Sequence, residues 1–232
     1  MLPIKTQTTL PRKKSAPSAF GRALERVRTR KEAMQPVRIG FLIDATGSRT
    51  ESWEQAQNIQ AGMFKTVAGM RHLSLRLVHF GGNMLIDHGW QTDTRALAAK
   101  MAAVRCKSGM TQILPGLEEF LDESEGYRAQ AIILVGDCFE EDSDKAERVA
   151  LALRGAGIRV FCFLEGEDWT AQTVFSRLAI VTGGAFAKLG ADLPLADLCE
   201  GVALLTAGGE KGLKRLKNKR AKQLLLTGPS KK

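Results

Sequence analysis

Three oxygen-bearing side chains lie within five residues of one another: Asp44, Thr46 and Ser48, in the segment Asp-Ala-Thr-Gly-Ser. They directly follow the apolar run Val37–Ile43. Alternate residues of an extended segment point to the same side, so we expect the three side chains to face one spot. A carboxylate and two hydroxyls are hard oxygen donors, the ligand type that Mg²⁺ prefers. The segment therefore predicts a divalent-cation site.

Two further segments carry oxygen donors that could complete such a site. Thr111 closes the segment Ser108–Thr111, just before a helix expected to begin near Ile113, so it is either the helix N-cap or a ligand. Asp137 follows a second apolar run, Ala131–Gly136. Each signal is weak alone, because a hydroxyl before a helix is usually a cap and a lone acid after a strand is common. Together they indicate one shared site.

The elements that must position these residues alternate between short apolar runs and helical patterns. We expect strands over Val37–Ile43, Leu73–Phe80, Asn83–Trp90, Ala131–Gly136, Ile158–Leu164 and Ala185–Leu189. We expect helices over Trp53–Met70, Asp93–Val104, Ile113–Leu121, Asp144–Arg154, Thr170–Thr182 and Leu193–Thr206. The predicted fold class is α/β, with a doubly wound, mostly parallel six-stranded sheet, one antiparallel edge strand and helices on both faces. Ligands of such sheets bind at the carboxyl ends of the strands, where Asp44 and Asp137 lie.

The three segments together resemble the metal-ion-dependent adhesion site (MIDAS) of von Willebrand factor A (VWA) domains. The matching motifs are Asp44-x-Thr46-Gly47-Ser48, Gly109-Met110-Thr111 and Val135-Gly136-Asp137. The resemblance covers about residues 36–209, including the number and order of elements. It implies a Rossmann-like domain in which Mg²⁺ or Mn²⁺ is held, directly or through water, by Asp44, Thr46, Ser48, Thr111 and Asp137.

The resemblance also implies a protein-binding module and not a catalyst, because in that family a partner's carboxylate fills the open position of the metal. The Thr-Gly-Ser variant is similar to bacterial cytosolic members found beside AAA ATPases, chaperones or tellurite-resistance-type systems, which implies a cytoplasmic protein with such a partner. Arg49 stands where the family often has Met, and a cation there would weaken ion binding or favour an acidic partner. Cys138 stands where a small residue is usual. Neither departure removes a ligand.

A metal-dependent phosphohydrolase is the alternative function that the residues leave open. It would need a general base beside the ion, for which Glu140, Glu141 and His88 are the candidates. The acidic run between positions 137 and 144 is also typical of a solvated loop whose acids favour the N-terminus of the following helix. Enzymes of this fold class with an aspartate nucleophile need a second carboxylate two positions after that aspartate. This sequence has Thr46 at that position relative to Asp44, so it lacks the pattern of these enzymes.

The net charge of +9 is unevenly distributed along the 232 residues. Residues 1–38 hold ten Lys or Arg against two Asp or Glu, and residues 210–232 hold nine against one. We therefore expect a basic, flexible N-terminal segment over 1–35, a VWA-like domain over 36–209 and a basic C-terminal tail over 210–232. Such ends could contact nucleic acid or an acidic surface, so a basic-tailed adaptor is a third candidate function.

The composition restricts the class of protein. With 44% hydrophobic and 25% charged residues, it is that of an ordinary globular chain and excludes a wholly disordered or collagen-like one. No apolar run approaches the roughly 20 residues of a membrane-spanning helix. The four cysteines lie far apart without a C-x-x-C pair, so we expect reduced thiols and no disulfide framework.

Overall fold

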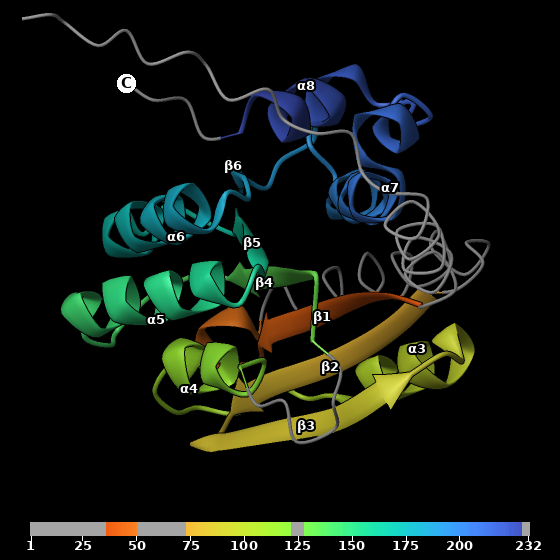
Figure 1. The fold of residues 1–232 in the computed structure, drawn as a ribbon. Helices are drawn as coiled ribbons and strands as arrows, with labels where there is room; N and C mark the ends of the chain where they lie inside the picture. The colour runs from red at the N-terminus through yellow and green to blue at the C-terminus, as the bar shows by residue number, and fades with distance from the viewer. Residues whose placement is uncertain (1–35, 51–72, 122–127, 229–232) are drawn as a thin grey trace, which may run out of the picture. The chain divides into compact units, whose positions relative to one another are not determined.

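A computed structural model describes residues 36–50, 73–121 and 128–228, and within these ranges six strands form one sheet in the order β3-β2-β1-β4-β5-β6 (Figure 1). The strands are β1 (Val37–Asp44), β2 (Leu73–Gly81), β3 (Met84–Gln91), β4 (Ala131–Gly136), β5 (Arg159–Leu164) and β6 (Phe186–Lys188). Every neighbouring pair is parallel except β2 and β3, which are antiparallel. The predicted α/β fold with one antiparallel edge strand is confirmed.

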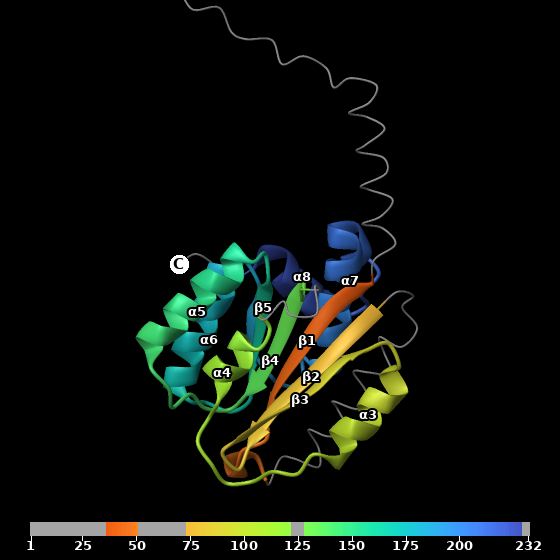
Figure 2. The same cartoon turned by 60° about the horizontal axis from the view of Figure 1, so that its bottom comes forward.

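The helices lie on both faces of this sheet. They are α3 (Thr94–Ala103), α4 (Ile113–Glu118), α5 (Ser143–Gly155), α6 (Trp169–Thr182), α7 (Leu195–Leu213) and α8 (Lys219–Thr227), with a short 3₁₀ turn η1 (Gly47–Arg49) after β1. Figure 2 shows α4, α5 and α6 on one side of the strands, and α3 and α7 on the other. The helix predicted over Trp53–Met70 lies outside the described residues.

Two apolar cores separate along these faces because strand side chains alternate. Ile39, Phe41 and Ile43 of β1 belong to the core with α3, α7 and α8, whereas Leu42 belongs to the core with α4, α5 and α6. A strand that is covered on both faces must be apolar at nearly every position, which explains the near-continuous apolar run. Gly40 lies against the Phe120 ring, since a Cβ there would stand 2.2 Å from Phe120 Cε1.

The C-terminal part differs from the predicted tail. A Gly at position 209 with φ of +57° interrupts α7, and the chain continues through α8. Leu213, Leu216, Ala221 and Leu225 of this basic segment are buried in the same core as β1. Four residues between positions 210 and 228 are therefore packed in the core of the domain. None of the helices in the described part of the chain is long and apolar enough to cross a bilayer.

Candidate metal centre

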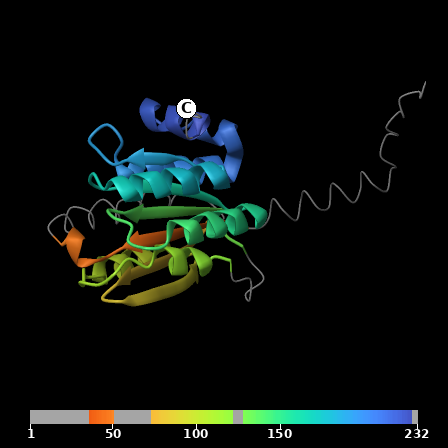
Figure 3. The same ribbon diagram turned by 90° about the vertical axis from the view of Figure 1, so that its left-hand side faces the viewer.

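The two predicted carboxylates come together at the carboxyl edge of the sheet. Asp44 is the last residue of β1, and Asp137 directly follows β4. These strands are parallel neighbours, with Ile43 paired to Val135, so both carboxylates leave the sheet at the same edge. Figure 3 shows η1 and the end of β4 at that edge.

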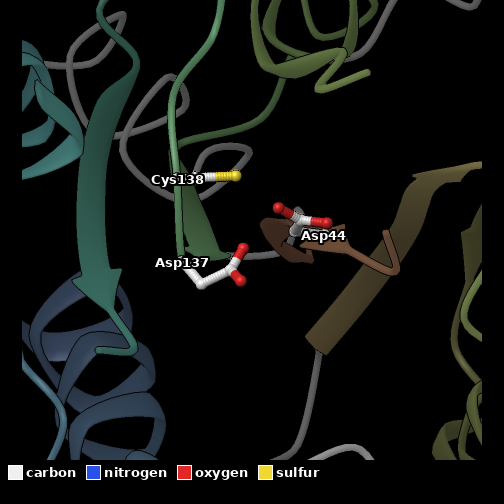
Figure 4. A group of neighbouring side chains, drawn as sticks. All are labelled: Asp44, Asp137 and Cys138. Atoms are coloured by element: carbon white, nitrogen blue, oxygen red, sulfur yellow. The ribbon is translucent and has the colours of Figure 1, made fainter. Parts of the chain in front are cut away.

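The carboxylates face one another with unused oxygens. Oxygen atoms of Asp44 and Asp137 and the sulfur of Cys138 all lie within 4.8 Å of one another (Figure 4). Asp44 has 0% exposed surface, and its Oδ2 has no hydrogen-bond partner; Oδ1 of the half-buried Asp137 is buried and unpartnered as well. Buried polar atoms are nearly always satisfied in folded proteins. A cation held between these two oxygens would satisfy both.

The environment of Asp44 opposes its negative charge. The pKa of this carboxyl is raised to about 6, mainly by burial and in smaller part by the negative charge of Asp137. Hydrogen bonds from Thr46 and the positive charge of Arg49 lower the pKa of Asp44 and so limit the shift. A divalent cation would supply the missing positive charge, so the electrostatics as well as the orphaned oxygens fit a metal ion.

The Thr-Gly-Ser turn curls back onto Asp44. The backbone N–H of Thr46 donates to Asp44 Oδ1 over 2.7 Å, and Thr46 Oγ1 lies 3.1 Å from Ser48 Oγ. Thr46 is buried, whereas Ser48 is exposed. Both hydroxyls lie on the loop that carries Asp44, and Ser48 is the one open to solvent.

The loop before α4 is hydrogen-bonded to this turn. Lys107 pairs with Thr46 in an isolated parallel bridge, and its N–H donates to Ala45 O over 3.0 Å. A Cβ at Gly47 would stand 2.7 Å from Ser108 Oγ, so the close approach of the two loops requires glycine there. The loop that ends in Thr111 therefore adjoins the metal candidate.

Thr111 bonds to the third loop and not to its own helix. Its hydroxyl accepts a hydrogen bond from the backbone N–H of Glu140 over 3.2 Å, and its N–H donates to Glu140 Oε2 over 3.0 Å. The N-cap of α4 is Gln112, which makes no side-chain cap bond. The cap alternative for Thr111 is therefore wrong, and buried Thr111 links two of the three loops of the site.

Glu141 supplies the missing cap of α4. Its carboxylate oxygens accept from the N–H groups of Ile113 and Leu114 over 2.5 and 2.7 Å. Asp142 does cap the following helix, accepting from the N–H groups of Asp144 and Lys145. Within the acidic run, Asp142 caps the following helix α5, as expected. Glu140 and Glu141 instead bond to Thr111 and the start of α4, almost thirty residues earlier in the sequence.

Sequence reasoning assigned no structural role to Arg49. Its side chain is 1% exposed; Nε and Nη2 bond to Oε2 of Glu165 over 2.8 and 2.7 Å, and Nη1 donates to the carbonyl oxygen of Asp44. The guanidinium charge is therefore neutralised by Glu165 and fixes the backbone of a metal candidate. The replacement of the family's usual Met was the available signal, but nothing in the sequence identified the acid that pairs with Arg49.

Solved structures share this arrangement of strands and helices. The VWA domain of SpRpn10 has a TM-score of 0.56 at 12% identity, over 75% of this chain and 97% of that one. Proximal thread matrix protein 1 from the mussel byssus, with a zinc-occupied MIDAS motif, has a TM-score of 0.59 at 17% identity, over 75% of this chain and 46% of that one. Manganese-loaded TRAP protein from Plasmodium vivax has a TM-score of 0.55 at 18% identity, over 74% and 72%.

These likenesses define the class of fold. The chain has the fold of VWA domains, which confirms the resemblance drawn from its three motifs. No protein-family model and no curated protein matches the sequence. The assignment of individual side chains to a metal therefore depends on the geometry of the site.

Proposed function

We propose that this protein is a metal-dependent protein-binding module that acts in the cytoplasm. A divalent cation is held by Asp44, Thr46, Ser48, Thr111 and Asp137, and a carboxylate of the partner protein completes its coordination. The observation that carries the proposal is the pair of buried, unpartnered oxygens, Asp44 Oδ2 and Asp137 Oδ1, on facing side chains at the edge of a VWA fold. The oxygen donors of this set suit Mg²⁺ or Mn²⁺.

The surface beside the site favours an acidic partner. A cavity of about 300 Å³ reaches Ala45, between the two metal-loop residues Asp44 and Thr46. Among the described residues that line it, none is acidic, and five carry basic or imidazole groups: His79, His88, Lys100, Arg105 and Lys107. A segment with one carboxylate on the metal and further acids in this cavity would meet charge of opposite sign in both places. An AAA ATPase or chaperone-type protein that offers such a segment is the partner class we propose.

The three candidate bases of the hydrolase alternative are engaged in hydrogen bonds with other groups. Glu141 has both carboxylate oxygens engaged by α4, and Glu140 bonds to the N–H of Thr111. The third, His88, is paired with His79 through ring nitrogens 3.2 Å apart. These engagements support binding over hydrolysis, and a phosphate-release assay with Mg²⁺ or Mn²⁺ separates the two functions: turnover that is lost in Asp137→Ala would favour the hydrolase.

The proposal is tested first with the metal alone. Titration calorimetry of the full chain with Mn²⁺ should give one saturable site, and Asp44→Asn should abolish it while leaving the circular dichroism spectrum unchanged. Asp197→Asn is the matched control, because Asp197 lies on α7 and, among the described residues, belongs to no group of metal-ligating side chains. Equal Mn²⁺ binding by the wild type and Asp44→Asn would overturn the metal site.

The partner is tested second, with glutamate-rich and matched glutamine-rich peptides. The acidic peptide should bind the wild type in Mn²⁺ and lose most of its affinity in EDTA and in Asp44→Asn. Lys100→Gln combined with Lys107→Gln should weaken peptide binding without weakening Mn²⁺ binding. Peptide affinity that is the same in Mn²⁺ and EDTA would contradict a metal-bound carboxylate.

A further inference from the structure

The sulfur of Cys138 lies in the same cluster as the two metal-candidate carboxylates. Its Sγ and one oxygen of each of Asp44 and Asp137 are mutually within 4.8 Å, and Figure 4 shows the thiol and both carboxylates around one space. Cys138 follows Asp137 directly at the end of β4, so the strand that positions the carboxylate positions the thiol too.

Two independent features point to a ligand at this cluster. Asp44 is fully buried, and its free Oδ2 faces the other two groups without a hydrogen-bond donor. Asp137 Oδ1 is likewise buried and unpartnered. Cys138 is the third side chain of this cluster, beside two carboxylate oxygens that have no partner. It forms no disulfide, so its sulfur is available to a metal.

A thiol changes which ions such a cluster favours. Thiolate sulfur is a soft ligand that selects Zn²⁺ and related ions, whereas carboxylates, hydroxyls and water suit Mg²⁺ and Mn²⁺. Zinc bonds to sulfur at about 2.3 Å and to carboxylate oxygen at about 2.0–2.2 Å, so ligands of one tetrahedral ion stand roughly 3.5 Å apart. The observed spacing of up to 4.8 Å thus needs a contraction of about 1 Å, which small side-chain rotations supply.

We propose that Cys138 is a direct metal ligand and that, together with Asp44 and Asp137, it makes the site prefer Zn²⁺ to Mg²⁺. This inference rests on the proposed function, because it concerns the ion held at the same site. On binding, the S–H bond of Cys138 breaks, its electron pair forms the sulfur–metal bond, and the proton passes to the solvent. With Zn²⁺, Asp44, Asp137 and Cys138 replace the five-residue oxygen set proposed for Mg²⁺ or Mn²⁺, and they leave the fourth position of a four-coordinate ion free for the partner's carboxylate.

Cobalt is the probe, because a thiolate bound to Co²⁺ gives a near-ultraviolet charge-transfer band that oxygen ligands do not give. The full-length wild type, titrated with Co²⁺ under reducing conditions, should develop this band to saturation. Cys138→Ser should bind Co²⁺ without the band and lose about 10–100-fold in Zn²⁺ affinity, measured by competition with a chelating dye. Its Mg²⁺ affinity should stay within about twofold of the wild type.

Cys106→Ser is the matched control, since Cys106 is also a half-buried free thiol and, among the described residues, it belongs to no group of three metal-ligating side chains. It should keep the band and the Zn²⁺ affinity. Co²⁺ binding without a band in the wild type, or a band that persists in both Cys138→Ser and Cys138→Ala, would overturn Cys138 as a ligand and leave the oxygen site standing. Failure of Co²⁺, Zn²⁺, Mn²⁺ and Mg²⁺ alike to bind would overturn the proposed function as well.

Discussion

Arg49 and Glu165 form an ion pair, with 2.7 Å between Nη2 and Oε2, that joins the turn after β1 to the residue after β5. The arginine side chain is 1% exposed and the glutamate side chain 28% exposed, so the cation is the more deeply desolvated member. Because Arg49 also donates to the carbonyl oxygen of Asp44, the pair connects the metal candidate to a strand two positions away in the sheet.

Removing Glu165 should therefore destabilise the protein more than its own exposure suggests. Glu165→Gln leaves the buried Arg49 charge without its acid, and we expect a loss of about 2–4 kcal/mol in the free energy of unfolding, measured in urea. In Arg49→Met/Glu165→Gln the buried charge is absent, so this double variant should be more stable than Glu165→Gln. A double variant that is less stable than both Glu165→Gln and Arg49→Met would contradict this explanation.

Gly47 should support the close approach of the loops around the metal. In Gly47→Ala, the new Cβ would stand 2.7 Å from Ser108 Oγ and 3.1 Å from Ser108 Cα, so the second loop must move. We expect Mn²⁺ affinity to fall about tenfold, as when a supporting contact of a metal site is lost. Calorimetry of Gly47→Ala/Ser108→Gly should show partial recovery.

Gly155→Ala serves as the control for this experiment, because a Cβ at Gly155 would meet nothing within 4 Å. It should leave Mn²⁺ affinity unchanged. Unchanged affinity in Gly47→Ala itself would show that the two loops do not depend on one another.

The strands and their ends could be predicted from the sequence for a direct physical reason. Sheet burial on both faces forces continuous apolar runs, so β1, β4 and β5 are visible from local composition alone, and with them the positions of Asp44 and Asp137. The direction of the Glu140 and Glu141 side chains was not visible. Their hydrogen bonds join residues almost thirty positions apart, and local helix rules favour the nearer helix.

Helix α8 was not predicted, because the basic residues of the C-terminal segment made its apolar positions hard to recognise in the sequence. Three of the nine residues of α8 are Lys or Arg, yet Ala221 and Leu225, four residues apart, lie on one side and are buried. The helical spacing was present in the sequence, but a segment so basic is also typical of a solvated tail. Gly209, which has a positive φ, interrupts the helix before this segment, and the Gly208-Gly209 pair was the turn signal available in the sequence.

Stability should decrease in mild acid through the stacked pair of His79 and His88, whose ring centroids are 5.1 Å apart. Burial and, to a smaller extent, the positive charges of His88 and Lys107 together lower the pKa of His79 to about 4. Between pH 6.5 and about 4 the unfolded chain therefore binds a proton that the folded protein does not, and folding stability falls as the pH falls.

Urea unfolding of the wild type and His79→Phe at a series of pH values checks this expectation. Phenylalanine keeps a flat ring against His88 but cannot be protonated, so the variant should gain stability relative to the wild type by about 1–3 kcal/mol between pH 7 and pH 4. Other groups titrate in this range, but they are common to both proteins. A difference between the two that is independent of pH would contradict the shifted pKa of His79.

Helix α8 packs against α7 through Leu225. Gly201 of α7 lies so close to Leu225 that a Cβ there would stand 2.3 Å from Leu225 Cδ1. Leu225 is 6% exposed and belongs to the core that includes β1. Leu225→Ala should therefore cost about 2–4 kcal/mol in urea unfolding, because it leaves a cavity in a packed interface.

The exposed neighbour Leu226 provides the matched control, with 49% of its surface accessible. Leu226→Ala makes the same chemical change one residue further along the same helix and should cost less than about 0.5 kcal/mol. If residues 210–228 were a free tail, neither substitution would change the free energy of unfolding. A difference of several-fold between them would instead assign the basic C-terminal segment to the folded domain, which then carries its positive charge on a fixed surface.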